Sequence, residues 1–277
     1  MMPRPIGSHG WRDAAGGALI SLAVACFGAL GTVNAQAATT SSLALRATGT
    51  TGTIVTGADQ FAVDGDTAVN ISVAGVSGGH ATVVAGPDSA LPSAVKFPSY
   101  VSSGTYPRAV VRLTPTSGDA LSPGSSDFAY GAVFRLDARS SGRSIDNGNN
   151  LFQRGLYSDS SQFKLQADGG YPSCLVRGSS GRVFVASSTK VTPDKWYRVT
   201  CSRVGSRVTV QVTPYGGGAT VSKVVSGSTG TVTFGSTVRA SIGGKLTSAG
   251  AVDSGSTDQF NGAVANVWIE RVPTPAR

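Results

Sequence analysis

The number and spacing of acidic side chains determine whether the chain could cleave a glycosidic bond. Asp and Glu together number 15, and only one of them, Glu270, is a glutamate. Hydrolysis with retention or inversion requires two carboxyl groups that flank the scissile bond. The aspartates are scattered through turn-like segments and are not paired on a strand. Glu270 falls near the end of a strand-like segment, where an ion pair with an arginine explains it. We therefore expect no catalytic residues.

A second motif with possible chemistry is Gly-Val-Ser-Gly-Gly at residues 75–79, which has the spelling of a serine nucleophile elbow and is followed by His80. In a nucleophile elbow the serine lies where a strand turns sharply into a helix. Residues 81–84 instead alternate in hydrophobicity, as a strand does. The histidine of a catalytic triad also comes from a distant segment. We interpret this motif as a coincidence in a Gly- and Ser-rich loop.

Two loops carry oxygen-bearing side chains that are candidates for calcium. Calcium binds carboxylate and amide oxygens, and the candidate ligands are Asp146, Asn147, Asn149, Asn150, Asp253 and Asp258. Asp and Asn are also the ordinary residues of tight turns. Calcium is therefore one candidate cofactor, and a purely structural role in turns is the alternative.

Strand patterns surround these loops. Residues 162–168 alternate, with Phe163, Leu165 and Ala167 on one face, as expected of a strand with one face in contact with solvent. Two shorter runs, 173–177 and 182–186, are separated by Gly-Ser-Ser-Gly, which predicts a hairpin. Residues 196–204 form a longer strand-like run. This succession of short strands and tight turns is typical of an all-β protein.

The whole composition agrees with that class. The chain has 277 residues with 37 Gly, and 40% of its residues are hydrophobic, enough for one sizeable core built from many short strands. In residues 128–136 the alternating Phe128, Tyr130, Ala132, Phe134 and Leu136 predict one wall of that core. We expect a two-sheet antiparallel sandwich.

The N-terminus predicts export. Arg4 and Arg12 precede an uncharged stretch, 14–33, and then Ala-Gln-Ala at 35–37, which indicates a secretory signal peptide cleaved after Ala37. An uncleaved membrane anchor and a lipid attached at Cys26 are the alternatives. We expect a secreted, extracellular protein with no membrane insertion after cleavage.

Export leaves two cysteines, Cys174 and Cys201, in an oxidising compartment, where pairing is expected. Both fall on short strands that we expect to be neighbours in one sheet. Closing this loop would stabilise the fold by about 3.5 kcal/mol. Two separate buried thiols are the alternative.

The order of several short motifs resembles that of the laminin-G-like, concanavalin A-like jelly-roll family. These motifs are Gln153-Arg154-Gly155, Phe163-Lys164-Leu165, Asp194 to Val199, Ala240 to Gly243 and Phe260 to Ile269. The resemblance covers residues 125–272 well and the preceding part weakly. It implies a jelly-roll sandwich in which Trp196 and Trp268 fill the core.

The resulting division of the chain has four parts. Residues 1–37 are the signal peptide, and 38–93 form a Thr-, Ser- and Gly-rich segment that supplies edge strands or is an extension. Residues 94–272 are the jelly-roll domain, and 273–277 are a C-terminal tail.

The resemblance implies a non-catalytic, lectin-like module that binds a glycan or a cell-surface partner. A polysaccharide-cleaving hydrolase or lyase with unrecognised catalytic residues is one alternative. A structural surface protein held to an anionic wall polymer is another, because the formal net charge is +8. We expect a monomer without a nucleic-acid partner.

The alternation also predicts where a ligand would bind. Because Phe163 and its alternate neighbours fill the core side of their strand, the opposite face is expected to form a shallow groove. The side chains expected to line this groove or its edge are Arg154, Tyr157, Lys164, Gln166 and Tyr171.

Overall fold

The computed structural model describes residues 42–102, 104–117, 119–140, 148–254 and 258–272. The predicted signal peptide, the C-terminal tail 273–277 and the calcium candidates Asp146 and Asn147 lie outside these residues. Within the described part of the chain, no helix is long and apolar enough to cross a membrane. The described helix η1 spans only Ala58–Gln60.

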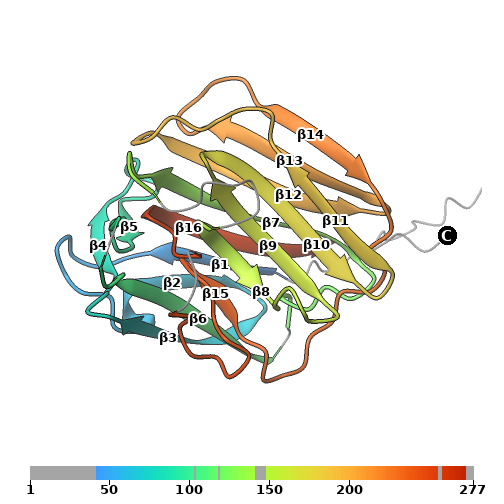
Figure 1. Ribbon diagram of the computed structural model, residues 1–277, viewed down its shortest axis with the longest axis horizontal. Helices are drawn as coiled ribbons and strands as arrows, with labels where there is room; N and C mark the ends of the chain where they lie inside the picture. Colours follow the sequence, from blue (N-terminus) through green and yellow to red (C-terminus); the bar gives the residue numbers. More distant parts are fainter. Residues whose placement is uncertain (1–41, 103, 118, 141–147, 255–257, 273–277) are drawn as a thin grey trace, which may run out of the picture. The chain divides into compact units, whose positions relative to one another are not determined.

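Almost all the other regular structure consists of antiparallel strands in two sheets (Figure 1). The nine-stranded sheet is called sheet I below. Its main path runs β14 (Val221–Ser226), β13 (Arg207–Pro214), β12 (Trp196–Val204), β7 (Asp127–Leu136), β16 (Gly262–Val272), β1 (Ser42–Ala47) and β2 (Phe61–Gly65). Beside β16 lies β5 (Ser93–Lys96), which pairs with β4 (Thr82–Ala85).

The seven-stranded sheet, sheet II, carries the site described below. Its order is β11 (Gly181–Ala186), β10 (Tyr171–Gly178), β9 (Gln162–Asp168), β8 (Asn150–Arg154), β15 (Ala240–Ile242), β6 (Arg108–Ser117) and β3 (Ala68–Val76). The prediction of an all-β, two-sheet antiparallel jelly-roll sandwich is confirmed. The segment before residue 94 contributes strands to both sheets, since β1 pairs with β16 and β3 pairs with β6.

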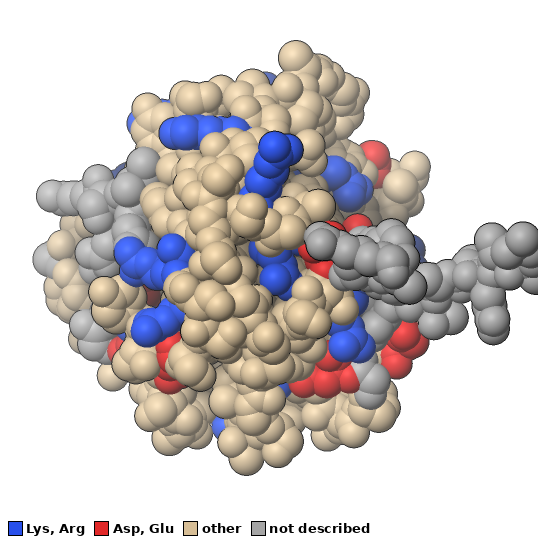
Figure 2. All heavy atoms as spheres, turned by 90° about the vertical axis from the view of Figure 1, so that its right-hand side faces the viewer, with Lys and Arg blue, Asp and Glu red and all other residues tan. Residues whose placement is uncertain are grey.

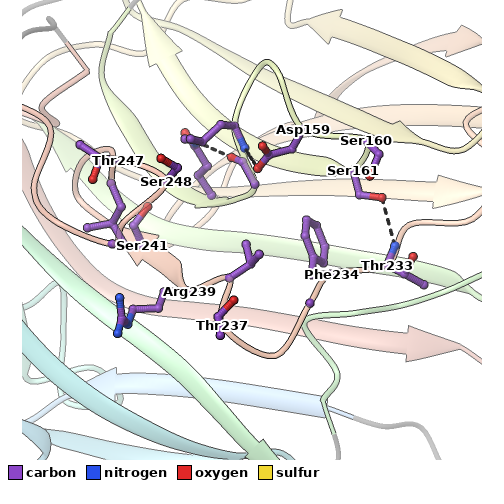
Figure 3. A pocket seen from close by; sticks show the side chains of 17 residues that line it. Asp159, Ser160, Ser161, Thr233, Phe234, Thr237, Arg239, Ser241, Thr247 and Ser248 are labelled. Carbon is purple, nitrogen blue, oxygen red and sulfur yellow. Dashed lines mark hydrogen bonds between the residues drawn. The ribbon is translucent and has the colours of Figure 1, made fainter.

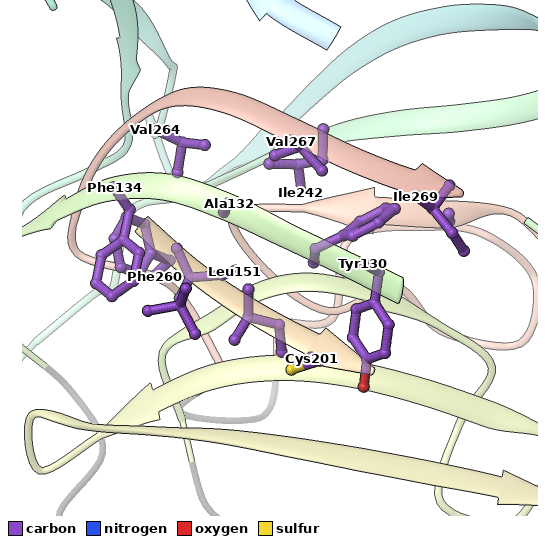
Figure 4. Close-up of a cluster of buried hydrophobic side chains, with 14 of the residues drawn as sticks. Tyr130, Ala132, Phe134, Leu151, Cys201, Ile242, Phe260, Val264, Val267 and Ile269 are labelled. Carbon is purple, nitrogen blue, oxygen red and sulfur yellow. The ribbon is translucent and has the colours of Figure 1, made fainter. Parts of the chain in front are cut away.

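The core lies between the sheets, and the predicted wall on β7 faces into it (Figure 4). All five alternating residues from Phe128 to Leu136 are buried. From sheet II, Phe163 packs against Tyr130 with ring centroids 5.0 Å apart, and Phe152 packs against Phe163 at 5.2 Å. Burying each such ring stabilises the fold by about 1.5–3 kcal/mol.

The predicted disulfide between Cys174 and Cys201 is confirmed, with 5.6 Å between the α-carbons. The expectation that both cysteines lie in one sheet is wrong. Cys174 belongs to β10 of sheet II, whereas Cys201 belongs to β12 of sheet I. Both side chains face the core, so the bond crosses the sandwich and joins its two layers.

The two tryptophans are also placed differently from the expectation. Trp196 and Trp268 are partly buried in a separate apolar cluster with Leu91 and Val133, away from the main core. Alternation explains Trp196, because the next residue, Tyr197, packs against the main core. On β16 a register shift between Val264 and Asn266 reverses the alternation and turns Trp268 outward.

Candidate ligand-binding groove

The outer face of sheet II carries one continuous row of side chains that runs across the strands. On β9, Phe163 and Leu165 fill the core, so Lys164 between them points outward. Strand register then aligns Lys164 with one outward residue from each neighbouring strand. From β11 to β6 the row is Phe184, Leu175, Lys164, Gln153, Ser241 and Arg112.

Two hollows lie over this row and meet at Gln153, which lines both. The first has a volume of about 220 Å³ and is lined by Asn150, Gln153, Tyr157, Gln162, Lys164, Leu175, Lys245 and Asp258. The second has a volume of about 270 Å³, and Ser241 and Gln153 belong to its lining. We call the two hollows together the groove.

Hydroxyl groups dominate the second hollow, as Figure 3 shows. The labelled side chains include Ser160, Ser161, Thr237, Ser241, Thr247 and Ser248. Asp159 and Arg239 lie on opposite sides of it (Figure 3). Ser161 accepts a hydrogen bond from the backbone N–H of Thr233 at 3.2 Å, which fixes one wall.

Amide side chains form the floor of the first hollow. Asn150, only 1% exposed, donates through Nδ2 to Oε1 of Gln153 at 2.8 Å. Gln153 in turn donates to the carbonyl of Gly155 at 2.7 Å, and Gln162 donates to the same carbonyl at 3.1 Å. Within the described residues, Oδ1 of Asn150 has no hydrogen-bond partner. Buried polar atoms are normally paired, so this acceptor is an exception in the floor of the hollow.

Tyr157 forms the rim of the first hollow at the β10 side. The residue is 70% exposed, more than any other large apolar residue in the described part of the chain. Arg182 stacks over the ring with its Cζ atom 5.3 Å from the centroid, and Arg177 donates to the Tyr157 carbonyl. Asp159 stabilises the same turn by accepting a hydrogen bond from the backbone of Leu156 at 2.8 Å. An exposed ring is thus held in place by its neighbours.

Lys245 and Asp258 form the opposite rim. The Lys245 ammonium lies 3.1 Å from Asp258 and 3.2 Å from Asp253. Burial acts to lower the pKa of Lys245, but the two carboxylates outweigh it, and the pKa is raised. The calcium candidates Asp253 and Asp258 therefore surround a lysine. Among the described residues, no group of three or more acidic, His or Cys side chains could hold a metal ion.

Arg154 corrects the predicted lining of the groove, because its side chain is completely buried. A register shift between Asn150 and Phe152 aligns Arg154 with Phe163, so both point into the core. There the guanidinium bonds Asp119 at 2.8 Å and the Val238 carbonyl at 2.9 Å. Burial lowers the pKa of Arg154, and Asp119 partly opposes that shift.

Of the other four predicted residues, two line the first hollow and two do not. Tyr157 and Lys164 line the same hollow, and Lys164 is 9% exposed. Gln166 lies one row away, aligned with Asn150 and Ser173, and is buried. Neither Gln166 nor Tyr171 lines the two hollows.

Asn149 and Gln153 also bear on the predicted site. The calcium candidate Asn149 is buried, and its Oδ1 accepts from the Asn261 backbone at 3.4 Å. The sequence prediction missed Gln153, the central residue of the groove. Strand alternation could have identified it if the position of the irregularity in β8 had been known.

No protein-family model matches the sequence, and no curated protein matches it. Solved structures with a similar fold include the full-length tailspike protein 2 of Escherichia coli O157:H7 bacteriophage CAB120. It is 14% identical over 73% of this chain and 26% of the tailspike chain, with a TM-score of 0.46. The present chain thus spans about a quarter of the tailspike's length.

Two further similar structures come from other organisms. Domain 4 of AbnA, a GH43 extracellular arabinanase from Geobacillus stearothermophilus in complex with arabinotriose, is 15% identical. That match covers 74% of this chain and 84% of the domain, with a TM-score of 0.47. Domains LG4-5 of the mouse laminin alpha1 chain are 16% identical over 55% of this chain and 39% of theirs, with a TM-score of 0.39.

Proposed function

We propose that this protein is a glycan-binding module without catalytic residues, and that a sugar chain binds in the groove. The observation that carries this proposal is the buried amide floor beside one exposed aromatic ring. Sugar hydroxyls both donate and accept hydrogen bonds, and the amides of Asn150, Gln153 and Gln162 can do the same. Tyr157 adds an apolar surface for a ring face together with a polar tip.

The length of the groove supports a chain as the ligand. The row from Leu175 to Ser241 crosses four neighbouring strands, β10, β9, β8 and β15. At about 4.8 Å between strands, its floor is about 14 Å long. A ligand with several hydroxyl groups along its length could bond to Lys164, Gln153 and Ser241 in turn, whereas a small compact ligand would fill only part of this floor.

The carboxylates around the groove support binding without cleavage. Asp258 is paired with Lys245, and Asp159 accepts the Leu156 N–H, so both have structural partners. Glu270 is exposed on β16 of sheet I, opposite Ala129 of β7, and so belongs to the other sheet. Two carboxylates flanking a glycosidic bond would be needed for hydrolysis.

We also propose that the protein is secreted and acts on an extracellular glycan. The disulfide that joins the two sheets supports an oxidising compartment. N-terminal sequencing of protein from culture medium tests the export route, with Ala38 as the expected first residue. Recovery of protein that begins at Met1, or that carries a modified Cys26, would contradict it.

A glycan array followed by calorimetry with the strongest ligand tests binding in the groove. Tyr157→Ala should weaken binding at least about tenfold, about 1.4 kcal/mol, because the exposed ring is removed. Lys164→Met should also weaken it, because the charged group in the floor is lost while its length is kept. The thermal midpoint of Tyr157→Ala should change little, since the residue is 70% exposed.

Tyr106→Ala is the matched control for this experiment. Tyr106 is also exposed, has an arginine, Arg108, over its ring at 5.9 Å, and lines neither hollow. We expect this variant to bind the glycan as the unmodified protein does. If Tyr157→Ala binds as tightly as Tyr106→Ala, the glycan site lies elsewhere.

A further inference from the structure

Two arginines stand directly opposite each other at the end of the groove. Strand register pairs Arg177 of β10 with Arg182 of β11, and Arg177 also with Gln162 of β9, which lines the first hollow. The residues beside the arginines, Val176 and Val183, are buried in the core. By alternation, both arginines project from the outer face of sheet II.

This arrangement is electrostatically unfavourable by itself, because like charges directly opposite each other on paired strands repel. Within the described part of the chain, neither arginine forms an ion pair with Asp or Glu. The acid in the adjacent turn, Asp159, accepts the Leu156 N–H instead. The positive charge of the pair is therefore left without a described counter-charge.

Both arginines nevertheless have a defined position, because both contact Tyr157. Arg177 donates to the Tyr157 carbonyl, and Arg182 stacks over the ring at 5.3 Å. A guanidinium has five N–H donors in a planar fork. Arg177 uses Nη1 for the carbonyl, and Arg182 makes no described hydrogen bond, so several donors remain beside the exposed ring.

We propose that Arg177 and Arg182 form a subsite for an oxyanion group on a sugar ring that stacks on Tyr157, so that the glycan bound in the groove is acidic. This inference rests on the proposed glycan-binding function. A carboxylate and a sulfate both present coplanar or clustered oxygens that an arginine fork can bond in pairs. Either group would also neutralise the repulsion between the two arginines.

Two matched polymer pairs test this subsite by calorimetry on the full protein. Polygalacturonate is compared with its carboxyl-reduced form, and dextran sulfate with dextran. We expect at least one acidic polymer to bind about tenfold or more tightly than its neutral counterpart. A preference within the first pair identifies a carboxylate as the ligand group, and a preference within the second identifies a sulfate.

Arg182→Gln should abolish that preference, and Arg182→Lys should restore only part of it, because lysine keeps the charge but not the planar fork. Arg182 is exposed, so these variants should fold normally. Arg207→Gln is the control. It removes the same charge from an exposed residue of β13 in sheet I, and it should keep the preference.

A failure of the acidic-subsite proposal can be distinguished from a failure of the groove proposal. Equal binding of acidic and neutral polymers, no binding of either acidic polymer, or equal losses in Arg182→Gln and Arg207→Gln would overturn the acidic subsite. Each of these results leaves the groove intact if Tyr157→Ala still weakens binding of a neutral glycan. If no glycan responds to Tyr157→Ala, the groove proposal fails as well.

Discussion

The Tyr130 hydroxyl reaches from sheet I across the core and donates a hydrogen bond to the carbonyl of Leu175 in sheet II at 2.9 Å. It also lies 3.2 Å from the carbonyl of Lys164. Leu175 and Lys164 are neighbours in the floor of the groove. A buried polar group of sheet I thus supports the strands that present the candidate ligand-binding side chains.

Replacement of Tyr130 by Phe should lower the free energy of unfolding by about 1–2 kcal/mol. The ring packing is kept, but the single O–H donor shared by the Leu175 and Lys164 carbonyls is lost. The hydrogen bond contributes about 1 kcal/mol, and the buried acceptors left without it add to the loss. Urea unfolding measures the change. An unchanged transition midpoint would show that the two carbonyls find other donors.

Tyr130 also predicts a loss of stability at alkaline pH. Burial raises the pKa of Tyr130 above its ordinary 10.0, because the charged phenolate would be poorly solvated in the core. Above pH 10 the unfolded chain releases a proton that the folded chain keeps, so stability falls as pH rises. The decline should be steeper in the unmodified protein than in Tyr130→Phe, by up to about 1.4 kcal/mol per pH unit. Parallel declines would contradict this assignment.

The inter-sheet disulfide should contribute about 3.5 kcal/mol to the free energy of unfolding, because it closes a loop of 27 residues in the unfolded chain. The double variant Cys174→Ala, Cys201→Ala tests this by urea unfolding under non-reducing conditions. Adding a reductant should destabilise the unmodified protein and leave the double variant unchanged. Equal stabilities in the absence of reductant would disprove the predicted contribution.

The sequence was sufficient to predict the sandwich, because alternation and turn residues are local signals. The wall on β7 is one example, since Phe128 to Leu136 alternate without interruption. The disulfide pairing was also predictable, because cleavage of the predicted signal peptide would leave only two cysteines. The sheet to which each cysteine belongs was not, since strand order depends on contacts between distant segments.

Irregularities in the strands explain the errors at the site. The register shift in β8 determines which of Gln153 and Arg154 faces the groove. No local residue pattern indicates where this shift occurs. A register shift in β16 has the same effect on Trp268. One extra residue in a strand moves every later side chain to the opposite face, so predictions made by counting residues fail beyond it.

Arg154 should therefore affect stability and not binding. Arg154→Ala leaves Asp119 without its buried partner and removes the contact with Phe234, where the guanidinium lies 4.7 Å from the ring centroid. Breaking such a pair costs about 3–5 kcal/mol, measurable by thermal or urea unfolding. Arg154→Lys should cost less, since the charge is kept. If either variant folds normally but loses glycan affinity, Arg154 contributes to the site in a way that its burial does not explain.

Lys245 predicts how the rim responds to calcium. Its ammonium already neutralises Asp253 and Asp258, so calcium should not bind these two carboxylates in the unmodified protein. In Lys245→Met the carboxylates lose this partner, and the variant should be less stable and gain stability when calcium is added. Lys195→Met, which removes an exposed lysine, is the control and should show neither effect.

A calcium site with a Kd of about 10 µM would add about 2.7 kcal/mol at 1 mM calcium, which thermal unfolding detects easily. If the unmodified protein gains such stability, and Asp253→Asn or Asp258→Asn abolishes it, calcium displaces Lys245 and the original calcium hypothesis for these two residues is correct.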